Sequence, residues 1–155
     1  MNVPGWFRLL ARNHFAIAPI RWAMAAIISL FAPVNIFFAL LQRFRLGRAI
    51  DETKLADDPV FVIGHWRSGT TYLHELLVRD ERFTYPNTYD VFAPDHFLVS
   101  GPVIKPWVKY LLPKTRPMDN VAAGWERPQE DEFALCALGL RSPYLTIAFP
   151  NRPQD

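Results

Sequence analysis

The loop at residues 64–71 (GHWRSGTT) carries the residues of this chain that are best suited to hold an anion. It lies between an apolar, β-branched-rich run at residues 59–63 and a segment in which Leu73, Leu76 and Leu77 recur at the spacing of an amphipathic helix. The first amides of a helix have no partner within the helix, and the helix dipole adds partial positive charge there. The sequence therefore predicts a strand, a glycine-bounded loop and a helix whose N-terminus binds phosphate or sulfate.

The loop departs from the nucleotide-binding P-loop directly after its second glycine. Gly64 and Gly69 keep the P-loop spacing, but Thr70 stands where that loop has a lysine. The nearest cation is Arg67, whose guanidinium offers a planar fork of donors to phosphate oxygens. An enzyme that uses a magnesium nucleotide also needs an acidic metal ligand on a second strand, and the sequence shows no apolar strand that ends in Asp. We therefore expect a phosphorylated ligand that binds without a metal.

The same loop resembles the 5′-phosphosulfate loop of the sulfotransferases that use PAPS (3′-phosphoadenosine 5′-phosphosulfate) as the sulfuryl donor. In many of these proteins the loop contains a basic residue followed by Ser-Gly-Thr-Thr and comes after a strand. Later blocks at residues 116–120 (RPMDN) and 127–133 (RPQEDEF) resemble a mainly microbial, uncharacterised branch of the family. The resemblance covers residues 59–149, and no later Arg and Ser match the family's 3′-phosphate site. We interpret the chain as the N-terminal portion of a longer enzyme, a fragment that is not expected to be active alone.

The resemblance implies roles for the individual loop residues. The expected donor-binding residues are Gly64, His65, Trp66, Arg67, Ser68, Gly69, Thr70 and Thr71. Arg67 is also the first catalytic candidate, because sulfuryl transfer, like phosphoryl transfer, depends mainly on positioning and charge stabilisation. The alternative for Arg67 is a surface arginine paired with an acid, and the alternative for the hydroxyl residues is ordinary helix capping.

An acceptor hydroxyl or amine needs a general base within hydrogen-bonding reach. We expect this catalytic role from Glu130 or Glu132, with His65, His74 and Asp131 as further candidates. On a helix, Glu130 shares a face with apolar residues, so partial burial is expected there. The alternative is that these acids only stabilise the N-terminus of a helix.

Residues 1–50 form a basic and apolar segment. They contain six Arg and no Asp or Glu, whereas residues 51–155 contain eleven Lys or Arg and fifteen Asp or Glu. Residues 22–41 carry no charge and are long enough to span a bilayer, although Pro33 and Asn35 interrupt the second half. Three arrangements are open, namely a transmembrane anchor, one or two interfacial helices broken at Pro33, and packing against the enzyme body. The charge favours an anionic membrane surface as the partner of residues 1–48 over nucleic acid.

These elements predict an α/β fold with a P-loop-like, three-layer parallel sheet of the sulfotransferase type, incomplete in this chain and preceded by an apolar helical segment. Residues 1–50 would form the helical segment and residues 51–155 the N-terminal part of the sulfotransferase-like domain. We also expect a short helix after Pro106, a helix that starts at the block of residues 127–132 and ends at Gly139, and a second core strand at residues 144–149.

The expected function is transfer of a sulfuryl group from PAPS to a hydroxyl or amine on a small molecule, lipid or glycan. The protein would be membrane-associated or cytoplasmic, with no metal and no nucleic-acid partner. A degenerate P-loop kinase or NTPase is an alternative, and the missing loop lysine counts against it. The other alternative is a non-catalytic, membrane-associated protein that keeps only the fold.

Overall fold

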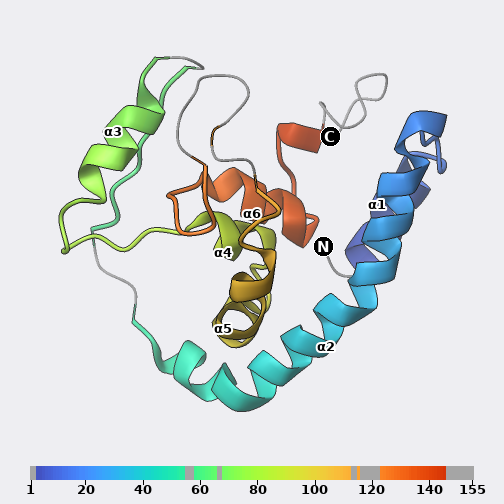
Figure 1. Cartoon of the computed structure of the whole chain (residues 1–155), viewed down its shortest axis with the longest axis horizontal. Coiled ribbons are helices and arrows are strands. Elements are labelled where there is room, and N and C mark those ends of the chain that lie inside the picture. The colour runs from blue at the N-terminus through green and yellow to red at the C-terminus, as the bar shows by residue number, and fades with distance from the viewer. Residues whose placement is uncertain (1–2, 55–57, 66–67, 113–114, 116–122, 146–155) are drawn as a thin grey trace.

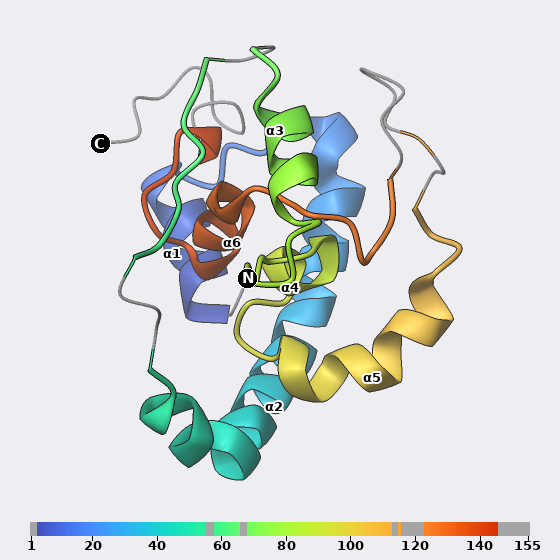
Figure 2. The ribbon, with the colours of Figure 1, turned by 90° about the vertical axis from the view of Figure 1, so that its left-hand side faces the viewer.

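The computed structural model describes residues 3–54, 58–65, 68–112, 115 and 123–145. These residues are mainly helical, in the order α1 (Val3–Arg12), η1 (Pro19–Arg21), α2 (Trp22–Glu52), α3 (Thr70–Leu77), α4 (Thr88–Phe92), α5 (Phe97–Val108) and α6 (Asp131–Leu138). Figure 1 shows α4, α5 and α6 at the centre, with α1 and α3 on opposite sides and α2 running beneath them. Figure 2, seen from the α3 side, shows α4 and α6 lying together behind α3.

The predicted parallel sheet is wrong for the described residues. Residues 59–63 are extended but form no strand, and the side chains of Val60, Phe61 and Ile63 are 56, 75 and 90% exposed. A strand forms only when its backbone groups pair with a neighbouring strand. The described ranges contain no strand, and an isolated bridge joins Asn87 and Pro128. The second predicted strand begins as a helical turn at residues 144–145, and its remaining residues lie outside the described ones.

The apolar N-terminal segment forms one long helix. α2 contains 31 residues and includes Pro33, so the break predicted at that proline is wrong. The helical stretch Pro19–Glu52 is long and apolar enough to cross a membrane by length and composition, and only 6% of its apolar window is buried. Length and composition alone do not separate a membrane span from a helix that lies on a surface.

α2 packs against the other helices at two places along its length. The indole nitrogen of Trp6 in α1 donates to the Ser29 hydroxyl at 2.8 Å. Further along α2, the Gln42 side chain donates to the Asp95 carbonyl and accepts from the Leu98 amide, both at 3.0 Å. At these two places α2 therefore has the third predicted arrangement, packing against the body.

A buried polar network joins α2, α4 and α5. The Ser100 hydroxyl oxygen lies 2.7 Å from His96 Nδ1 and accepts a 2.8 Å hydrogen bond from the Tyr89 hydroxyl. His96 Nε2 lies 3.3 Å from the side-chain oxygen of Asn35 in α2. Ser100 is fully buried and His96 is 4% exposed. Because buried polar groups cost free energy unless they are paired, this network fixes how α2 sits on the body.

We expect His96 to make the folded state less stable in mild acid. Burial lowers the pKa of His96 from its ordinary value, and neighbouring Asp95 opposes that effect only in part. Since the unfolded chain, with a His pKa of about 6.5, then binds more protons than the folded chain, the stability contribution is full above that pH. It is lost as the pH falls through the lower pKa of the folded state.

Urea unfolding at pH 7.5 and pH 5.5 checks this expectation. The His96→Gln variant should show a smaller difference in unfolding free energy between the two pH values than the unmodified protein. His65→Gln, at an exposed position, should keep the full difference. Equal pH dependence in the unmodified protein and in His96→Gln would contradict the assignment.

Candidate functional site

The predicted anion loop lies at the N-terminus of α3. Gly69 is the N-cap residue and has φ +92°, a left-handed conformation that favours glycine. The amide and the hydroxyl of Ser68 both donate to the His65 carbonyl, at 3.2 and 2.6 Å. These contacts close the loop into a tight turn directly before the helix. Trp66 and Arg67, both predicted to bind the donor, lie outside the described residues.

Gly64 packs directly against the first residue of α3. A Cβ atom at Gly64 would lie 2.5 Å from Thr70 Cγ2 and 2.8 Å from Ser68 Oγ. Both distances are far below van der Waals contact, and neither atom belongs to a long, flexible side chain. The two glycines therefore have different tasks, since Gly69 supplies the turn and Gly64 permits close packing.

The start of α3 has the electrostatics of an anion site. Its N-cap has no side chain, and no side-chain capping hydrogen bond or first-turn acid occurs among the residues described there. Ser68 and Gly69 are exposed, while Thr70 and Thr71 are half-buried. The backbone amides and the dipole at this end of α3 therefore face an environment that favours negative charge.

The two predicted catalytic acids lie at the start of α6. Glu130 is the N-cap residue of this helix and Glu132 is in its first turn, the position that the helix dipole favours for acids. The Glu130 carboxylate accepts a hydrogen bond from the Tyr144 hydroxyl. Glu130 is exposed, so the expected partial burial is wrong, whereas Glu132 is half-buried.

The described residues do not bring the loop and the acids together, because α3 and α6 lie apart in Figure 1. An ion pair from Arg127 Nη1 to Glu75 Oε2, at 3.2 Å, joins α3 to the segment before α6. An open hollow of about 480 Å³ lies beside this pair. Of the further candidate bases, Asp131 is the first residue of α6, and His74 packs edge-to-face against Tyr85 with ring centroids 6.3 Å apart.

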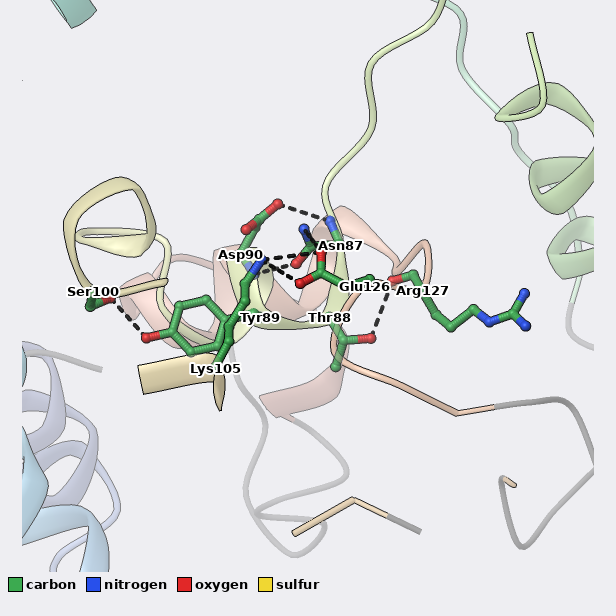
Figure 3. Close-up of polar contacts among 8 residues, drawn as sticks. All are labelled: Asn87, Thr88, Tyr89, Asp90, Ser100, Lys105, Glu126 and Arg127. Atoms are coloured by element: carbon green, nitrogen blue, oxygen red, sulfur yellow. Dashed lines mark hydrogen bonds and ion pairs between the residues drawn. The ribbon is translucent and has the colours of Figure 1, made fainter. Parts of the chain in front are cut away.

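The sequence analysis missed the contacts that attach the segment before α6 to α4 (Figure 3). Asn87 and Asp90 form a reciprocal capping box at the start of α4. The Thr88 amide and hydroxyl both donate to the Arg127 carbonyl, at 2.9 and 3.2 Å. Beside this junction, Lys105 forms a 2.9 Å ion pair with Glu126. An Asn followed three residues later by an acid is a recognised helix start, and it was available in the sequence.

A family model described as the sulfotransferase family matches residues 59–134, which include the anion loop and both predicted acids. Over this stretch the chain is similar to the sulfotransferase family. The predicted family resemblance is thereby confirmed.

Two relatives in this sulfotransferase family are named omega-hydroxy-beta-dihydromenaquinone-9 sulfotransferase Stf3, from Mycobacterium bovis (strain ATCC BAA-935 / AF2122/97) and Mycobacterium tuberculosis (strain CDC 1551 / Oshkosh). Each is 50% identical to this chain over 152 residues, an alignment that covers 98% of this chain and 39% of the relative. The chain thus spans 39% of the length of the curated relatives that it matches. No solved structure matches it.

Proposed function

We propose that the protein to which this chain belongs transfers a sulfuryl group from PAPS to a hydroxyl group on an apolar acceptor. The observation that carries the proposal is the closed turn at the start of α3. Gly64 contacts Thr70 there, and Ser68 is bonded back to the His65 carbonyl. This turn lies inside the stretch that matches the sulfotransferase family. It supplies unpartnered helix amides at the point where the family resemblance expects the 5′-phosphosulfate group.

In this proposal the loop residues hold the donor and stabilise its charge. The amides and hydroxyls of Thr70 and Thr71 bind the 5′-phosphate, while Ser68, bonded to the His65 carbonyl, shapes the loop. The Arg67 guanidinium binds the phosphate and sulfuryl oxygens. The acceptor oxygen forms a bond to sulfur while the bond from sulfur to the phosphate oxygen breaks, and PAP (adenosine 3′,5′-bisphosphate) leaves. The acceptor's proton passes to a general base, for which we propose Glu130 or Glu132.

The proposed acceptor is a hydroxylated, quinone-type lipid. This class is taken from the names of the Stf3 relatives, which specify a hydroxylated dihydromenaquinone. The long apolar helix at the N-terminal side of the loop supports an acceptor of this kind, because it gives the protein a means of contact with the membrane where such lipids dissolve. We accordingly propose a membrane-associated protein in which residues 1–50 make the contact and residues 51–155 begin the catalytic domain.

Replacing Arg67 with alanine is expected to weaken PAP binding by the full-length protein by about tenfold to a hundredfold. The reason is that a charge-assisted hydrogen bond contributes about 1.5–3 kcal/mol. Calorimetric titration with PAP, with and without Mg²⁺, measures the effect, and the affinity should not depend on the metal. Arg79→Ala, an exposed arginine just beyond α3, is the matched control and should bind normally. Folded protein that binds Mg-ATP and not PAP would contradict the proposal and favour a kinase or NTPase.

Changing the general base to glutamine should lower kcat by about 10²- to 10⁴-fold and leave the PAP dissociation constant unchanged. Glu130→Gln and Glu132→Gln are compared in the full-length protein with a hydroxylated menaquinone analogue as acceptor. Tyr144→Phe removes the donor to Glu130 and tests whether that contact positions the carboxylate. If both glutamine variants keep kcat within a few-fold of the unmodified value, the two acids only stabilise the start of α6.

A further inference from the structure

The side of α2 that faces away from α4 and α5 is strongly apolar. Leu30, Phe37 and Phe44 follow one another at seven-residue intervals, which places them on one side of the helix, and they are 72, 62 and 89% exposed. Trp22 and Leu40 extend the same side and are also exposed. We call these five residues the outer stripe. It extends over about 33 Å of helix at the usual rise of 1.5 Å per residue.

Two polar side chains near the middle of α2 lie on the side opposite the outer stripe. Asn35 and Gln42, also seven residues apart, are the side chains that bond to His96, to the Asp95 carbonyl and to the Leu98 amide. A helix on the surface of a water-soluble protein has the reverse arrangement, with its apolar side on the body and its polar side in water. The outer stripe is therefore suited to an apolar environment outside the described body.

The charge around the outer stripe indicates an anionic lipid surface. Residues 1–50 contain six arginines and no acid, and all six arginines are exposed. Arg43 and Arg48 pair with Asp51 and Glu52, at 2.8 Å each, near the C-terminal end of α2. Of the other four arginines, Arg8 and Arg12 lie in α1, Arg21 lies directly before α2, and Arg45 lies within α2. Exposed basic residues that border an apolar helix side are typical of helices that bind anionic headgroups and insert into the interface.

The polar contacts of α2 argue against a span across the bilayer. If residues 35–42 crossed the hydrocarbon core, the Asp95 carbonyl, the Leu98 amide and the helices that carry them would have to enter it as well. α5 carries exposed Lys109 at its C-terminal end, and α4 is joined to exposed Glu126 and Arg127. Such groups belong in water.

We propose that α2 lies in the plane of an anionic phospholipid bilayer, with the outer stripe inserted among the lipids and the body on the aqueous side. This arrangement would hold the catalytic domain at the leaflet surface, where a hydroxylated lipid presents its polar end. The proposal rests on residues 1–50 and their contacts with the body, and it does not require the sulfuryl-transfer assignment to be correct.

Vesicle flotation of the full-length protein tests the lipid surface. We expect binding to vesicles of mixed phosphatidylglycerol and phosphatidylcholine, and at least tenfold weaker binding to phosphatidylcholine alone. Phe37→Glu and Phe44→Glu should each lower the partition coefficient at least about tenfold. Each variant removes an aromatic side chain that would insert among the lipids, and each adds a negative charge. Trp107→Glu is the matched control, because Trp107 is an aromatic residue in α5 that is 83% exposed. This variant should bind the vesicles as tightly as the unmodified protein does. Equal binding to both kinds of vesicle, or equal loss in the control, would overturn the proposal.

Insertion depth separates an in-plane helix from a spanning one. Single cysteines at positions 30, 37 and 44, in a cysteine-free background, are labelled with an environment-sensitive fluorophore and quenched with lipids that carry spin labels at known depths. A similar shallow depth at all three positions supports the proposal, and a graded depth shows a span and overturns it. A blue-shifted label without vesicles shows that another part of the protein covers the outer stripe, which also overturns it. PAP titration of the same variants should be normal, so a failure of donor binding remains a separate result.

Discussion

The Gly64→Ala variant is expected to lose about tenfold to a hundredfold in PAP affinity. Its added methyl group would lie 2.5 Å from Thr70 Cγ2 and 2.8 Å from Ser68 Oγ. Ser68 is held by its bond to the His65 carbonyl, and Thr70 is a β-branched residue in the first turn of α3, so neither side chain moves away at low cost. Overpacking of this kind costs about 1–3 kcal/mol. In the loop it destabilises the conformation that binds the donor, so the affinity for PAP decreases.

Two further variants make this result specific. Gly64→Ala combined with Thr70→Ser removes the methyl group that clashes, and it should recover part of the lost affinity in the calorimetric titration. Gly101→Ala places a methyl group at a buried glycine in α5, where the nearest atom is 3.5 Å away, so it should bind PAP normally. If Gly64→Ala bound PAP as tightly as Gly101→Ala does, the close approach of the loop to α3 would have no part in donor binding.

The Ser100→Ala variant is expected to lower the free energy of unfolding by about 2–4 kcal/mol. It deletes a fully buried hydroxyl that accepts from the Tyr89 hydroxyl and contacts His96 Nδ1. Both partners would remain in the core without their hydrogen bond, and an unsatisfied buried polar group costs about 1–3 kcal/mol. Urea unfolding of the full-length protein at pH 7.5, where His96 is neutral in the folded state, measures the change.

A double-mutant cycle with Tyr89→Phe isolates the hydroxyl pair. The variant that carries both changes has no unpaired tyrosine hydroxyl, so it should be less destabilised than the sum of the two single variants, by about 0.5–3 kcal/mol. Thr115→Ala, at an exposed position, should leave the free energy of unfolding within about 0.5 kcal/mol of the original. Strict additivity of Ser100→Ala and Tyr89→Phe would show that the 2.8 Å contact contributes no coupling energy.

The sequence predicted the helix ends well where they depend on one residue and its neighbours in the chain. The helix after Gly69 was expected from the leucine spacing, and α3 begins at the next residue. The helix expected after the block of residues 127–132 is α6, and its predicted stop, Gly139, is the C-cap with φ +77°. Glycine in the left-handed region is a property of one residue and its neighbours, so it can be recognised without knowledge of the tertiary contacts.

The predictions that failed depended on partners far away in the chain. Residues 59–63 have a strand composition, but a strand also needs a neighbour, and the described residues supply none beside it. The helix expected after Pro106 is in fact α5, which starts at Phe97 and continues through two prolines. Pro102 and Pro106 are both exposed, so water can satisfy the carbonyl groups that lose their amide donors.

The candidate site was predicted in part for the same reason. The positions of Gly64, Ser68 and Thr70 in one loop follow from their closeness in sequence. The separation of that loop from Glu130 and Glu132 depends on how α3 and α6 pack in the folded protein. The residue spacing within either segment does not predict this packing. The junction of α4 with the segment before α6 likewise pairs residues 39 positions apart, such as Thr88 and Arg127.

The bonds that Asn35 and Gln42 make with the body determine how the protein can be shortened for production. A hydropathy plot marks residues 22–41 as a segment to delete when a water-soluble version is wanted. Deleting α2 would leave His96 Nε2, the Asp95 carbonyl and the Leu98 amide without their present partners. We expect such a version to lack the apolar helix but to have a less stable body. Changing the outer stripe to polar residues, with Asn35 and Gln42 kept, is the sounder route to a soluble form.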